Sequence, residues 1–199
     1  PDAAALDGLL VQGGDLGKLL DEIITRRASF ADLPEGGALP AALGLRPGLD
    51  EASLLAQVFI GGEADLMDGL VPLLLTGGTN DIKAARRLED LMPMRASIAA
   101  IEVLEDVLLN GAGAKKAGPF TAKLDTFPGK PLQPKLGLLA DPLKALMLRV
   151  EAARPDRVAL ALLRRTEALH RFARVFLARY REAKDRRGWL DFDDLIELA

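Results

Sequence analysis

Residues 156–187 read DRVALALLRRTEALHRFARVFLARYREAKDRR, an uninterrupted stretch without glycine or proline. Ala, Leu and Arg dominate it, and all three are strong helix formers. Apolar side chains recur at steps of three, four or seven residues, at Val158, Leu162, Leu169, Phe172, Phe176 and Tyr180. The stretch therefore predicts one long C-terminal helix, with Asp156 as its N-cap and Gly188 as its stop.

The same periodicity extends toward the N-terminus, and the two-residue alternation typical of strands is nearly absent. Helices are predicted over residues 3–12, 15–30, 51–60, 63–75, 82–91, 95–109 and 141–153, with a short one over 39–44. Pro72 and Pro155 are expected to kink or end their helices, because proline lacks an amide hydrogen. The predicted fold class is all-α, with many helices.

Residues 110–140 interrupt this pattern with a long irregular segment. The segment is basic and contains four prolines, which keep it out of a long helix. A short hairpin around residues 126–130 is conceivable. Loops of this length are usually functional or mobile, so the segment is a candidate binding region.

The composition excludes several classes of protein. With 199 residues, 49% of them hydrophobic, the chain can form one ordinary domain or two small ones. It has no cysteine and a single histidine, which excludes disulfides and zinc sites built on Cys or several His. No apolar run approaches the roughly 18 residues of a membrane span, and the first residues lack the basic start of a signal peptide. We therefore expect a cytoplasmic protein without a membrane partner.

The motifs of common catalytic sites are missing as well. None of the glycine pairs at 13–14, 61–62 and 77–78 is followed by the Lys-Ser/Thr of a phosphate-binding loop. Nucleophile–base pairs have almost no candidates, because His170 is the lone histidine. We interpret His170 as a structural or surface residue, and we predict no catalytic residue, no metal site and no cofactor for the chain itself.

The net charge of −3 conceals a strong asymmetry along the chain. Residues 1–110 hold 8 Lys and Arg against 18 Asp and Glu, whereas residues 111–187 hold 18 against 7. The last segment, 188–199, holds 4 acids and no base. The basic part could bind a polyanion, or both parts could simply be solvated helix faces.

Cations of the loop and of the long helix are the candidate DNA contacts. They are Lys115, Lys116, Lys123, Lys130, Lys135, Arg164, Arg171, Arg174 and Lys184. On the helix they form stripes that could follow a phosphate backbone, or a solvent face whose side-chain stems cover apolar surface. Two loop aromatics, Phe120 and Phe127, could stack on bases, although we favour the view that they pin the loop to the helices.

The chain ends in an acidic cluster, Gly-Trp-Leu-Asp-Phe-Asp-Asp-Leu-Ile over residues 188–196. The aspartates could suggest a magnesium site, but Asp191 is better explained as an N-cap. Asp193 and Asp194 then lie in the first helical turn, where the helix dipole favours negative charge. Phe192 and Leu195 are expected to anchor this helix, so the motif is structural.

This motif resembles a segment of superfamily 1 helicases of the UvrD/Rep type, in which a long helix leads back into the first motor lobe. The chain is most similar to the alphaproteobacterial form of the AddA-type helicase–nucleases of double-strand-break repair. The segments that carry the resemblance are 180–184, 187–196, 19–23, 77–86 and 120–130. The terminal motif is fairly specific and the other segments are weak.

The resemblance implies that residues 1–187 are the helical insertion of the first motor lobe, called 1B, and that 188–199 begin the return into that lobe. Parents of this type are ATP-dependent 3'–5' DNA helicases and exonucleases that use ATP and magnesium and pair with an AddB-like subunit. Their ATP-binding and nuclease motifs would lie outside this chain. The expected role is therefore non-catalytic contact with duplex or forked DNA.

Two other functions compete with this expectation. The chain could be a helical protein–protein module that docks a partner subunit or a nuclease domain. It could also be a free-standing helical enzyme that uses the terminal aspartates, which is the less favoured reading.

Overall fold

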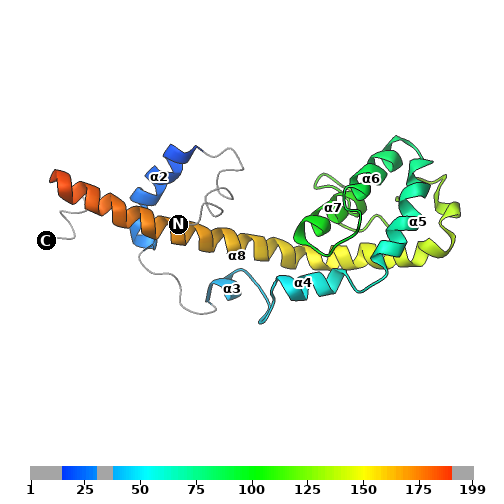
Figure 1. Cartoon of the computed structure of the whole chain (residues 1–199), viewed down its shortest axis with the longest axis horizontal. Coiled ribbons are helices and arrows are strands. Elements are labelled where there is room, and N and C mark those ends of the chain that lie inside the picture. Colours follow the sequence, from blue (N-terminus) through cyan, green and yellow to red (C-terminus); the bar gives the residue numbers. More distant parts are fainter. Residues whose placement is uncertain (1–14, 31–37, 190–199) are drawn as a thin grey trace. The chain divides into compact units, whose positions relative to one another are not determined.

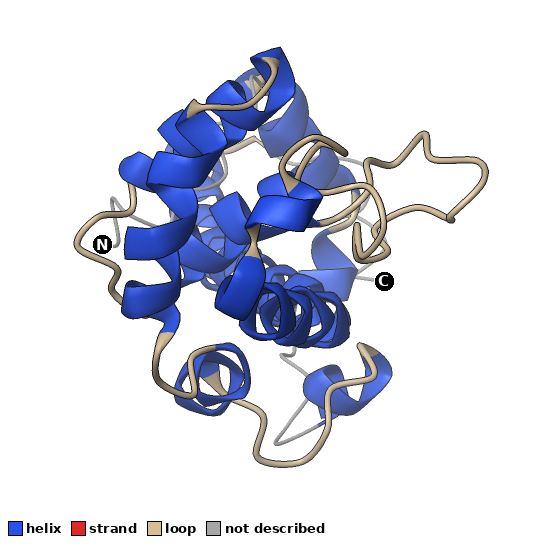
Figure 2. Cartoon of the chain, turned by 90° about the vertical axis from the view of Figure 1, so that its right-hand side faces the viewer, coloured by secondary structure: helices blue, strands red, loops and turns tan. Residues whose placement is uncertain are grey.

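The structure of the chain is a computed structural model that describes residues 15–30 and 38–189 (Figure 1). In these residues every regular element is helical, and the only β-type pairing is an isolated bridge between Leu109 and Ala122 (Figure 2). The all-α prediction is therefore confirmed, as is the long C-terminal helix, α8 (Ala140–Arg187). The helix predicted over 3–12 and the motif residues Asp191, Phe192, Asp193, Asp194 and Leu195 lie outside the described residues.

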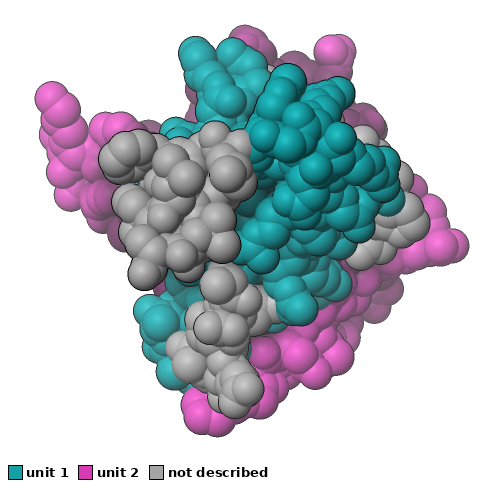
Figure 3. Space-filling view, turned by 90° about the vertical axis from the view of Figure 1, so that its left-hand side faces the viewer, with its two compact units in different colours: residues 1–46, 161–199 teal, residues 47–160 magenta. Residues whose placement is uncertain are grey.

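The chain divides into two compact units, residues 47–160 and residues 1–46 with 161–199 (Figure 3). The first unit contains α4 (Glu51–Val58), α5 (Glu63–Leu75), α6 (Thr79–Glu89), α7 (Ile98–Leu108) and the beginning of α8. Its core consists of fully buried aliphatic side chains, among them Leu54, Met67, Leu70, Leu74, Leu88, Ile101, Leu104, Leu108, Leu143 and Leu146. Each such side chain contributes about 1.5–3 kcal/mol by leaving water.

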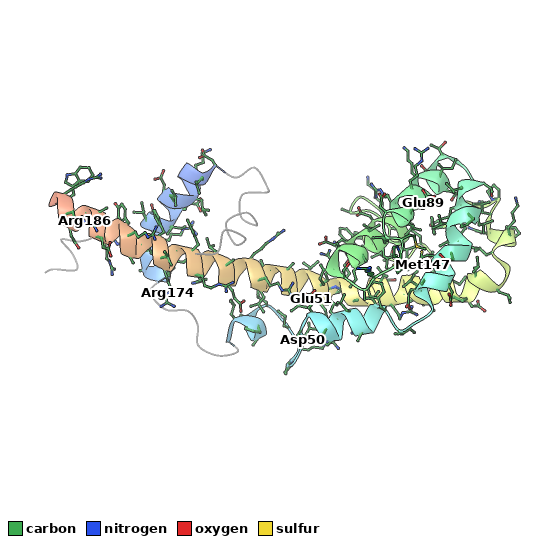
Figure 4. The ribbon with its side chains drawn as sticks, in the orientation of Figure 1. Asp50, Glu51, Glu89, Met147, Arg174 and Arg186 are labelled. Carbon is green, nitrogen blue, oxygen red and sulfur yellow. The ribbon has the colours of Figure 1, made fainter. Side chains whose placement is uncertain are left out.

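Polar caps determine where these helices begin. The Asp50 side chain accepts a hydrogen bond from Ser53 N at 2.7 Å, and Ser53 Oγ accepts one from Asp50 N at 2.9 Å. This capping box satisfies two backbone donors at the start of α4 (Figure 4). Ser97 is a simple N-cap of α7, since its Oγ accepts from Ala100 N at 3.1 Å.

The irregular loop between α7 and α8 is confirmed, and it packs through its own apolar side chains. Phe127 and Leu132 are buried, and the short 3-10 turns Gln133–Lys135 (η2) and Gly137–Leu139 (η3) lead into α8. The Gln133 side chain donates to the carbonyls of Asp125 and Pro128 at 3.0 and 3.1 Å. These contacts replace the hairpin considered around residues 126–130.

Neither of the two prolines ends its helix, so the expectation of a helix end at these positions is wrong. Pro72 lies inside α5 and Pro155 inside α8, so Asp156 is an interior residue and not an N-cap. Both prolines are exposed, as is Asp68, four residues before Pro72. Since a proline leaves the carbonyl four residues earlier without its amide partner, solvent can satisfy that carbonyl at Asp68. Buried neighbours, Val71 and Ala153, hold both helices in place.

In the other unit, α2 (Leu16–Thr25) is capped by Asp15, whose Oδ1 accepts from Gly17 N at 3.0 Å. The turn Arg27–Phe30 (η1) follows, and after the undescribed residues comes the short helix α3 (Ala38–Ala42). The Phe30 ring lies edge-on to His170 of α8, with centroids 5.2 Å apart. This contact agrees with the structural role predicted for His170.

Candidate nucleic-acid interface

The site is built on α6, which is fixed to the loop by one buried carboxylate. Asp81 Oδ2 accepts from Gly78 N at 3.1 Å, and its Oδ1 accepts from Gly129 N at 2.8 Å. The first bond caps α6 and the second joins it to a residue 48 positions away. A Cβ at Gly129 would lie 2.7 Å from Asp81 Oδ2, and one at Gly77 would lie 2.6 Å from the same oxygen. Glycine is therefore required at both positions for this close approach.

α6 presents three cations on one face and a buried apolar face opposite. Lys83, Arg86 and Arg87 stand at spacings of three and four residues, so they project from neighbouring positions on the helix surface; all three are exposed. The buried side of the helix is formed by Ala84, Ala85 and Leu88. The orientation of α6 is thus determined by its apolar stripe, which turns the cations outward.

These cations line a hollow of about 1110 Å³. Its other walls come from the end of α7, through Asp106 and Val107, and from the loop, through Lys123, Thr126 and Phe127. Arg87 pairs with Asp106 at 3.3 Å. Within the described residues, Lys83 and Arg86 have no ion-pair partner, so their charge is available to a ligand. We call Lys83, Arg86, Arg87 and Lys123 with this hollow the basic groove.

Lys123 connects the groove to the fold. Its Nζ donates to Val107 O at 2.7 Å, which satisfies one of the carbonyls left open at the C-terminal end of α7. Burial lowers the pKa of Lys123, the nearby Asp106 raises it and the charge of Arg87 lowers it further. Lys123 therefore lies between the carboxylate of Asp106 and the guanidinium of Arg87, and its own stem is partly buried in the fold.

A second hollow, of about 550 Å³, adjoins the groove at Asp106 and Lys123. Phe120 forms part of its wall, and the guanidinium of Arg154 lies 3.5 Å above the centre of the ring. The backbone of Phe120 has a φ of 59°, which is in the left-handed region and is strained for a bulky residue. Asn110 closes the base of this loop, since its Nδ2 donates to Thr121 Oγ1 at 2.9 Å. We call this the aromatic hollow.

Arginines of α8 join this region to the acidic helices of the same unit. Arg157 donates to both oxygens of Glu105, at 2.6 and 2.8 Å, and Arg154 Nε lies 3.3 Å from Glu105 Oε2 without hydrogen-bond alignment. Arg149 donates to Glu63 at 2.7 Å and to the carbonyl of Val58 at 2.9 Å. Part of the charge asymmetry of the sequence is therefore neutralised within the fold.

The predicted DNA contacts are placed in different surroundings. Lys115, Lys116, Lys130 and Lys135 are exposed on the loop, and Lys123 is half-buried. Arg164, Arg171 and Arg174 are exposed on α8 in the other unit; Arg174 is labelled in Figure 4. Lys184 is buried, with Nζ 5.4 Å from the centre of the Tyr180 ring. Lys123 lines the groove, and Lys130 lies between two lining residues, Gly129 and Pro131.

The sequence-based list omitted the three cations of α6. Their spacing on an amphipathic helix was a usable signal, because Lys83, Arg86 and Arg87 share one face. They lie in the acidic part of the chain, where residues 1–110 carry a net charge of −10. The overall charge of that part concealed a local basic patch.

Comparison with known proteins adds no assignment. No family model matches the chain, and neither a curated protein nor a solved structure does. Over the described residues, no cluster of three or more His, Cys, Asp or Glu could hold a metal ion. No helix in that part of the chain combines the length and apolarity needed to cross a bilayer.

Proposed function

We propose that this chain is a DNA-contacting helical accessory domain without chemistry of its own. The observation that carries the proposal is the basic groove, where three helix cations and Lys123 surround one hollow. Phosphate contacts from Lys and Arg supply most of the sequence-independent affinity of proteins for DNA. The exposed loop lysines Lys115, Lys116 and Lys130 add further cations to the same unit.

The resemblance to AddA-type enzymes gives the proposal its biological setting. We propose that the domain belongs to a cytoplasmic ATP-dependent helicase and exonuclease that repairs double-strand breaks with an AddB-like partner. ATP and magnesium would then serve the parent enzyme, and this chain alone would neither hydrolyse ATP nor cleave DNA. The proposed role is to hold duplex or forked DNA near the motor.

The proposal predicts salt-dependent binding that depends on the groove. Anisotropy of a labelled forked duplex should show binding at low salt, and Lys83→Ala/Arg86→Ala should weaken it. Loss of two phosphate contacts should lower the slope of log K against log salt by about 2. Arg95→Ala is the matched control, because Arg95 is exposed and does not line the groove.

Two results would contradict the proposed DNA contact. One is the absence of measurable binding at low salt. The other is binding that neither the groove variant nor charge reversal at Lys115, Lys116 and Lys130 changes. ATPase and nuclease assays with magnesium test the proposal that the chain has no catalytic activity. ATP hydrolysis or DNA cleavage that persists through purification would disprove it.

A docking module for another protein is the second candidate. It is favoured by exposed apolar side chains in the 47–160 unit, namely Ile60 at 66% exposure and Leu138 at 95%. Single exposed apolar residues are normal on soluble proteins, so this observation is weaker than the groove. The AddB-like subunit would be the partner in either case.

A further inference from the structure

The basic groove and the aromatic hollow adjoin each other. Both are lined by Asp106 and Lys123, so a ligand on the cations of α6 lies next to the hollow that Phe120 lines. The walls come from α6, α7 and the loop, all within the 47–160 unit. This surface therefore combines the positive charge of the basic groove with the aromatic ring of the neighbouring hollow.

The two loop phenylalanines have different roles. Phe127 is 9% exposed and packs the loop onto the core, as the sequence suggested for both rings. Phe120 is 36% exposed, and Arg154 lies over its ring at 3.5 Å from the centroid. Its left-handed backbone is held by the hydrogen bond from Phe120 N to Asn110 O, at 3.0 Å. A strained, supported and exposed aromatic ring is typical of a binding position.

Acidic side chains in the aromatic hollow do not prevent an anion from approaching. Glu102 accepts from Arg157 at 2.9 Å, and Asp106 pairs with Arg87 at 3.3 Å. Glu105 is buried beneath two arginines. Each of these carboxylates is thus already neutralised by a cation of the same unit.

We propose that the basic groove and the aromatic hollow together bind a single DNA strand. Consecutive phosphates lie on Lys83, Arg86 and Lys123, and one base stacks on Phe120. Charge that follows the backbone, combined with an aromatic platform for bases, is the usual way in which proteins hold single strands. This inference rests on the proposed function, because it also requires DNA binding, and it specifies the form of the DNA.

A duplex cannot use the whole surface. Its bases are already stacked and paired, and taking one out of the duplex is unfavourable. Duplex DNA can therefore contact the cations but not the ring. The single strand is the form that engages both parts.

The test compares an oligo(dT) strand, an abasic strand of the same length and a duplex of that length, using the unmodified chain. We expect the oligo(dT) strand to bind about 5- to 150-fold more tightly than the abasic strand, which reflects one stacked base. Phe120→Leu should remove that difference, because the ring on which the base stacks is then absent. Circular dichroism verifies that the variant is folded, and Arg95→Ala serves as the surface control.

The outcomes separate this inference from the proposed function. Equal binding of the oligo(dT) and abasic strands by the unmodified chain would overturn the single-strand path, while duplex binding would still support DNA contact. A folded Phe120→Leu variant that keeps the preference for bases would also overturn it. Failure of all three DNAs to bind would overturn both proposals.

Discussion

Glu105 is the buried carboxylate of α7 at which two arginines of α8 meet. Its side chain is 8% exposed, and Arg157 holds both of its oxygens. The hydrogen bonds that Arg157 donates to Glu105 raise the pKa of Arg157, although burial of the guanidinium lowers it. Removing one member of such a group leaves charge buried without a partner, which costs more than the pair itself contributes.

We therefore expect Glu105→Gln to lower the free energy of unfolding by about 3 kcal/mol. Glu102→Gln removes a carboxylate that also contacts Arg157 but is 56% exposed, and its cost should stay below about 1 kcal/mol. Urea denaturation followed by circular dichroism measures both. Equal costs for the two variants would show that burial at Glu105 does not matter.

At the scale of secondary-structure elements, features that depend on neighbouring residues could be predicted from the sequence. Features that depend on contacts between residues far apart in the sequence could not. Asp15 and Asp50 begin helices because their caps act within three residues. Residues on either side of Pro155, by contrast, have distant partners, since Arg154 and Arg157 both contact Glu105, which lies about fifty residues earlier. The groove likewise depends on the bond between Asp81 and Gly129, which no local pattern reveals.

Pro155 lowers the stability of α8, because proline has no amide hydrogen to donate within the helix. Ala at this position can donate its amide to the carbonyl of Glu151, so Pro155→Ala should raise the free energy of unfolding by about 1–3 kcal/mol. The position is exposed, so the smaller side chain loses little packing. Thermal denaturation checks this expectation, and a lower midpoint for Pro155→Ala would contradict it.

At the scale of the whole molecule, the chain separates into two units that share α8. The core, the ionic contacts of Glu63 and Glu105, and both hollows of the candidate site lie within residues 47–160. The exposed arginines Arg164, Arg171 and Arg174 belong to the other unit. The fold class could be predicted from periodicity, but this partition could not, because it reflects long-range packing.

The partition predicts that residues 47–160 fold alone. Such a chain has its own buried core, so it should show a helical circular dichroism spectrum and a single cooperative thermal transition. It should also retain the affinity for DNA that the groove provides. A fragment with helical content but no cooperative transition would show that the second unit is needed for stability.

The hydrogen bonds at the base of the loop have a practical consequence. Asn110 and Thr121 hold the two ends together, while Gly113 has no atom within 4 Å of where its Cβ would stand. Since the chain contains no cysteine, Gly113→Cys would create a unique attachment point for a fluorescent dye. The dye would stand beside Lys115 and Lys116, so its emission would report directly on the approach of a ligand to this surface.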